Sequence, residues 1–87
     1  MKDKREKIGA RLMAGEIMEA WETYNEGIRH WYEMKESGEE IDIDACVDME
    51  INNFDNARYQ IMCKYIERGL DADLAEDVAL NPEDYTS

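Results

Sequence analysis

The position of its only proline limits the fold of this chain more than any other feature. Pro82 lies close to the end of the 87 residues, so the chain upstream lacks the residue that breaks helices most strongly. Through most of that stretch, apolar residues recur every three or four positions, which places them on one face of an α-helix. The sequence therefore predicts an all-α protein with long helices.

The first predicted helix covers about residues 6–36. Its apolar stripe consists of Ala10, Met13, Ile17, Ala20, Trp21, Tyr24, Ile28 and Trp31. The opposite face is rich in glutamate. Gly38 follows the last periodic positions and suits the left-handed residue that ends many helices, so residues 37–41 are predicted to form a loop.

A second helix is predicted for about residues 43–68. Asp42 or Asp44 can cap its start, because a carboxylate accepts hydrogen bonds from the free N–H groups of a first turn. Gly69 suits the end of the helix. Arg58 falls on the apolar stripe, where it either packs its stem on the core with its head in solvent or pairs with an acid of a facing helix.

A short third helix is predicted at about residues 72–80, with Asp71 or Asp73 as its cap and residues 81–87 as a tail. The three helices make one small domain over residues 1–87. Because the loop between the long helices is short, we expect them to form a long antiparallel hairpin.

This hairpin has more apolar surface than two helices can bury against each other. The short third helix can cover only one end, and Met62 and Ile66 add a second apolar side to the 43–68 helix. Self-association into a dimeric four-helix-type bundle is the usual remedy, so we expect a homodimer.

A net charge of −12, from 22 acidic and 10 basic residues, limits the partners of the chain. It disfavours direct binding to nucleic acid and to anionic membranes, which both depend on positive charge. No apolar run reaches the ~20 residues of a membrane span, and the charged start differs from a secretion signal. The two cysteines, Cys46 and Cys63, are too few for a disulfide scaffold. We therefore expect a cytoplasmic protein with reduced thiols, in the host cytoplasm if it is phage-encoded.

The acidic residues concentrate late in the chain. Residues 1–11 carry +3, whereas residues 37–87 carry −11. The candidate partner-binding acids are Glu39, Glu40, Asp42, Asp44, Asp48 and Asp55. Carboxylates repeated along a helical rod can take the places of phosphates along a nucleic acid, and a protein groove built for DNA or RNA would attract them. Trp31 and Tyr32 are the candidate anchors, because Trp and Tyr dominate many protein interfaces.

These features predict a small acidic interaction protein that inhibits or regulates a larger nucleic-acid-handling enzyme by covering its basic surface. In composition the chain is similar to small phage proteins that block nucleases and other defence enzymes. No motif carries this similarity. Two other uses of the charge stay open: the acidic surface keeps a small protein soluble, or it receives the basic start of a second copy.

An enzymatic alternative rests on Glu16 and Glu19. This E-x-x-E resembles half of the metal site of the all-α nucleotide pyrophosphohydrolases of the MazG type, which also need an E-x-x-D on a following helix. The only match, from Glu39 to Asp42, falls in the predicted loop, and Glu16 and Glu19 are predicted mostly on the outer face of the first helix. The resemblance implies metal-dependent nucleotide hydrolysis, whereas the residues themselves favour no catalytic role, metal or cofactor.

A ridge of aromatic residues offers a further alternative. It consists of Trp21, Tyr24, Trp31 and Tyr32. Such a ridge usually forms a core or a dimer interface, but it could also line a pocket for a nucleotide or another small molecule. The only histidine, His30, is predicted to be a peripheral helix residue.

Overall fold

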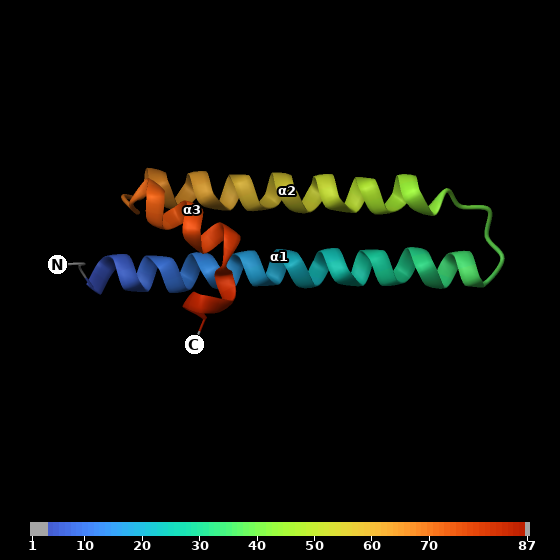
Figure 1. Cartoon of the computed structure of the whole chain (residues 1–87), viewed down its shortest axis with the longest axis horizontal. Coiled ribbons are helices and arrows are strands. Elements are labelled where there is room, and N and C mark those ends of the chain that lie inside the picture. The colour runs from blue at the N-terminus through green and yellow to red at the C-terminus, as the bar shows by residue number, and fades with distance from the viewer. Residues whose placement is uncertain (1–3, 87) are drawn as a thin grey trace.

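The computed structural model describes residues 4–86, and all regular secondary structure over that range is helical. It contains α1 (Lys4–Glu36), α2 (Ile43–Glu67), α3 (Ala72–Leu80) and a 3-10 turn, η1 (Pro82–Tyr85). Figure 1 shows α1 and α2 side by side as an antiparallel hairpin, with α3 crossing them near the chain's N-terminal end. The predicted all-α fold with two long helices is confirmed, and the observed helix bounds lie within two residues of the expected ones.

Two aspartates start the later helices, as expected. The Asp42 carboxylate accepts from the backbone N–H of Ala45 at 3.2 Å, and that of Asp71 accepts from Leu74 at 3.1 Å. Each bond satisfies an N–H group that has no partner inside its helix. The structure thus selects one cap from each pair that the sequence left open.

Two glycines end the long helices. Gly38 and Gly69 have φ angles of 95° and 107°, in the left-handed region that favours glycine. At the end of α2, the Leu70 N–H donates to Tyr65 at 2.9 Å and the Gly69 N–H donates to Ile66 at 3.0 Å, which is the Schellman pattern. This turn sends the chain back over the hairpin and so places α3.

The buried residues all lie at the end of the hairpin that α3 covers. They are Ala10, Met13, Ala14, Ile17, Tyr65, Leu70, Ala75, Val78 and Ala79. No residue from 18 to 64 is buried. The described molecule measures 57 × 22 × 14 Å, so beyond α3 the hairpin is a single layer of two helices, and no third element of residues 4–86 lies over it. Two helices alone do not close a core.

Part of the predicted tail forms the 3-10 turn η1. Pro82 starts a 3-10 turn, a position that suits its fixed φ and missing N–H, and Tyr85 then packs against the buried core. The Tyr85 hydroxyl also donates a hydrogen bond to Asp77 of α3. Four residues are too few to show a periodicity, so the sequence pattern alone gave no sign of this packing. Ser87 lies outside the described residues.

Candidate functional site

The antiparallel hairpin concentrates the negative charge at one end of the molecule. We call residues 18–57 the distal lobe and residues 4–17 with 58–86 the proximal half. The distal lobe has twelve acidic and two basic residues, a net charge of −10, whereas the proximal half has a net charge of −2. Because the chain folds back, the basic start of α1 lies beside the end of α2 and α3 (Figure 1). Charge therefore changes along the long axis rather than between the first helix and the other two.

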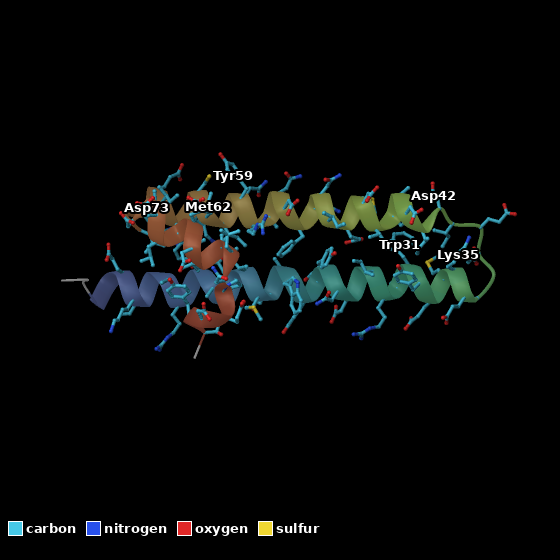
Figure 2. All side chains as sticks on the ribbon, viewed as in Figure 1. Trp31, Lys35, Asp42, Tyr59, Met62 and Asp73 are labelled. Carbon is cyan, nitrogen blue, oxygen red and sulfur yellow. The ribbon has the colours of Figure 1, made fainter. Side chains whose placement is uncertain are left out.

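The predicted acidic face of α2 is exposed along its length. Asp44, Asp48 and Asp55 are all exposed, and they lie on one side of the helix because four and seven residues are close to whole numbers of turns. Tyr59 extends this side, and Figure 2 shows it on the side of α2 that faces away from α1. The face is therefore accessible to a partner.

Arg58 is the base that pairs with this acidic face in the described part of the chain. Its guanidinium bonds the Asp55 carboxylate at 3.2 Å and lies 5.6 Å from the centre of the Phe54 ring. The partner of Arg58 is thus an acid of its own helix, and the pairing with a facing helix that the sequence left open is wrong. Three-residue spacing on one helix brings the two side chains together without any help from α1.

The remaining candidate acids lie at the far end of the distal lobe. Glu39 and Glu40 are exposed in the loop between α1 and α2, and Asp42 stays exposed although one of its oxygens caps α2. Together with Asp44 and Asp48 they surround the tip of the hairpin. The structure places five of the six predicted acids there, and Asp55 lies about two turns further along α2.

The two predicted anchors differ in their surroundings. Tyr32 is 53% exposed. Trp31 is half-buried and points into the space between α1 and α2 (Figure 2), where its indole N–H donates to the Glu50 carboxylate at 3.1 Å. Tyr32 is therefore available to a partner, whereas Trp31 joins the two helices.

The sequence pattern did not indicate a role for Glu50, the residue that accepts this bond. A Cβ added at Gly27 would lie 2.8 Å from the Glu50 Cδ. Because glycine has no side chain, the Glu50 carboxylate can lie directly against α1 at this position. A glycine inside a helix is unfavourable by about 1 kcal/mol relative to alanine. A glycine in the middle of α1 is therefore the sequence signal that could have indicated a close contact at this position.

Glu16 was expected on the outer face of α1, and this expectation is wrong. Its carboxylate faces α2, where it accepts hydrogen bonds from the Lys64 ammonium and the Tyr65 hydroxyl. Burial raises the pKa of Glu16, but these bonds outweigh it and hold the pKa below its ordinary value. Burial and the bond to Glu16 raise the pKa of Tyr65 to about 12. The three side chains thus tie the proximal ends of α1 and α2 together.

The four carboxylates of the MazG-type resemblance are not brought together. Glu16 is bonded to Lys64 in the proximal half, while Glu39 and Asp42 lie at the opposite end of the hairpin. Within residues 4–86, no three His, Cys, Asp or Glu side chains are grouped so that they could hold a metal ion. Cys46 and Cys63 both lie on α2 as free thiols, and His30 is exposed.

The bond between Tyr65 and Glu16 predicts a loss of stability at high pH. A folded-state pKa of about 12, above the ordinary 10, means that the unfolded chain loses its proton first, so the stabilisation is full below pH 10 and disappears towards pH 12. The contribution of Glu16 depends on pH in the opposite direction. Because its folded-state pKa is lowered, Glu16 stabilises the fold at pH values above its ordinary pKa, and this stabilisation is lost as the pH falls. We expect urea midpoints to fall less between pH 9 and pH 11 for Tyr65→Phe than for the wild type.

The exposed Tyr32→Phe is the control for this comparison and should keep the wild-type alkaline decrease. An equal decrease in the wild type and in Tyr65→Phe would contradict the prediction.

Two grooves lie beside the buried core. One has a volume of about 490 Å³ and begins where α3 ends, between Trp21 of α1 and Phe54 of α2. The other, of about 560 Å³, lies at the proximal end and includes the exposed side chains of Ile8 and Leu12. Neither groove is enclosed, and both have mainly apolar walls with an arginine at the edge.

Comparison of the chain with protein-family models, curated proteins and solved structures finds no match in any of the three. Among the described helices, none has an apolar stretch long enough to span a membrane.

Proposed function

We propose that this chain is a small acidic interaction protein that inhibits or regulates a larger nucleic-acid-handling enzyme by covering its basic surface. The observation that carries the proposal is the distal lobe, which has a net charge of −10 and no buried residue. A lobe that protrudes from the only core of the described chain, with so much charge of one sign, is suited to a basic partner.

The proposed mechanism is occlusion of the enzyme's nucleic-acid groove. The carboxylates of Asp44, Asp48 and Asp55 attract the basic groove, and those at the tip of the hairpin add to the field. Tyr32 supplies an aromatic anchor whose ring becomes desolvated on contact. Because the attraction is electrostatic, association should become slower as the salt concentration rises. The cytoplasm, of a phage host if the chain is phage-encoded, is the compartment that this proposal implies.

Charge reversal at Asp44, Asp48 and Asp55 together tests the proposal. The assay measures how much protein is needed to displace fluorescent duplex DNA from each of a panel of purified nucleases and restriction enzymes. For enzymes that the wild type inhibits, we expect the triple lysine variant to need at least about tenfold more protein. Helix content, measured by circular dichroism, should stay unchanged because all three residues are exposed.

The matched control reverses Glu67, Asp73 and Glu76, three exposed acids of the proximal half, and changes the net charge equally. We expect this control to inhibit like the wild type. Equal weakening by both triple variants would show that total charge matters rather than the acidic face of α2. The absence of inhibition across the panel would contradict the proposal itself.

We also propose that the protein forms a homodimer. Two distal lobes repel each other, so we propose that two copies meet through their nearly neutral proximal halves, at the groove that contains Ile8 and Leu12. This leaves both distal lobes free for partners. Light scattering should give twice the chain mass for the wild type and a reduced mass for Leu12→Glu; a wild-type monomer at ~0.1 mM would exclude a stable dimer.

A further inference from the structure

The proximal half shows how a third helix sits on this hairpin. The α3 residues Ala75, Val78 and Ala79 pack where α1 and α2 meet, and all three are buried there. α3 has nine residues, about 13.5 Å of helix, on a molecule 57 Å long. Most of the hairpin therefore offers the same kind of two-helix surface without the helix that would cover it (Figure 1).

The uncovered surface begins at the groove of about 490 Å³ where α3 ends. Trp21 is 46% exposed and Leu80, the last residue of α3, is 63% exposed, and both line this groove. Phe54 supplies the wall on α2. Large side chains left this open are where a further apolar group would gain most by contact.

Apolar residues continue from this groove along the distal lobe. On α1, Ile28 and Tyr32 follow Trp21 by seven and eleven residues, close to two and three whole turns, so they lie on the same side. On α2, Val47 and Ile51 precede Phe54 and Arg58 by seven residues each. The stripe from Trp21 to Tyr32 is ~16 Å long. It matches the length of a short helix laid on the hairpin.

Charge decides what kind of helix would bind there. Arg58 and Glu83 at the groove offset each other, and beyond them the distal lobe has a net charge of −10. A second copy would bring another lobe of −10 to this surface. A basic segment would instead meet exposed acids beside the apolar stripe, namely Glu22 and Glu33 on α1 and Asp44 and Asp55 on α2.

We propose that the distal continuation of the α1–α2 groove binds a basic amphipathic helix of the partner protein, in the manner in which α3 covers the proximal half. The inference rests on the proposed function and specifies what part of the basic partner is bound. The apolar side of the partner helix contacts Trp21, Phe54 and Ile51, and its lysines or arginines face the acids along the rims. On α2 this rim includes Asp44 and Asp55 of the acidic outer face, so the groove and that face adjoin each other.

A synthetic helix tests this inference without knowledge of the partner. The probe is a fluorescein-labelled peptide of about 14 residues that contains only leucine and lysine, with leucines at i, i+3, i+4 and i+7. Binding is measured by fluorescence anisotropy for the wild type, Trp21→Ser, Ile51→Ser and the control Tyr59→Ser. Tyr59 is exposed on the outer side of α2, away from the groove. A peptide of the same composition, scrambled so that the leucines no longer share a face, controls for charge alone.

We expect each groove variant to raise the Kd of the amphipathic peptide about tenfold or more, with Tyr59→Ser within twofold of the wild type. The scrambled peptide should bind at least tenfold more weakly. The inference would be overturned if both peptides bound equally well, or if both groove variants bound the amphipathic peptide with wild-type affinity. It would also be overturned if Trp21→Ser lowered the mass of the protein measured by light scattering. The last result would assign the groove to a second copy.

The peptide experiment and the nuclease experiment can fail independently of each other. Groove-dependent peptide binding without nuclease inhibition would contradict only the choice of enzyme class. Nuclease inhibition that depends on Asp44, Asp48 and Asp55 but not on Trp21 or Ile51 would contradict only the groove.

Discussion

Met13→Ala is expected to lower the free energy of unfolding by about 2–5 kcal/mol. Met13 is completely buried, and it lies in one cluster with Ile17 of α1 and Val78 of α3. Truncation removes apolar contacts and leaves a cavity that three helices would have to close together. Because this cluster is the only buried one among the described residues, no second core can compensate for the loss. Urea denaturation followed by circular dichroism measures the effect.

Met49→Ala is the matched control, because it removes the same atoms from an exposed position in the distal lobe. It should change the free energy of unfolding by no more than about 0.5 kcal/mol. If the two variants were equally destabilised, stability would not be concentrated in the core under α3, which would contradict the prediction.

Backbone amides of the distal lobe are expected to exchange hydrogen at least about 100-fold faster than those around the core, which corresponds to ~2.8 kcal/mol of opening free energy. The distal parts of α1 and α2 pack on each other without a buried residue, so a local opening there disrupts few apolar contacts. Residues 10–17 and 65–79 can open only by undocking α3 or by unfolding the whole core.

Hydrogen exchange followed by mass spectrometry or NMR resolves this difference by helix segment. The leucine–lysine peptide should slow exchange in the distal lobe if it binds along the groove, and it should leave the core segments unchanged. Uniform protection along both long helices would contradict the prediction, since it would mean that the hairpin opens as one unit.

Local patterns predicted the helices well. The stripe spacing, the aspartate caps and the glycines Gly38 and Gly69 act within a few residues of the chain, so a sequence displays them directly. The exposure of Asp44, Asp48 and Asp55 is local in the same sense, since it follows from the side of α2 opposite its apolar stripe. The end of the chain was predicted less well because Tyr85 depends on a surface built by α1 and α3.

The candidate site was predicted only in part. Tyr32 is exposed as its proposed role requires, but Trp31 is not, because Glu50 reaches it from a helix nineteen residues away in the sequence. Glu16 shows the same limit. The pattern of α1 alone places Glu16 on a polar face. Its position between the helices becomes visible only when α2 brings Lys64 and Tyr65 next to it.

By itself, the sequence determined that this chain forms three helices, where each begins and ends to within two residues, and that it carries a charge of −12. The tertiary structure decided where that charge lies and what remains uncovered. Antiparallel return brings the basic start beside the acidic end, which leaves −2 in the proximal half and −10 in the distal lobe. The physical reason is that capping and periodicity act over one or two turns, whereas charge balance and burial depend on segments that meet only after the chain has folded back.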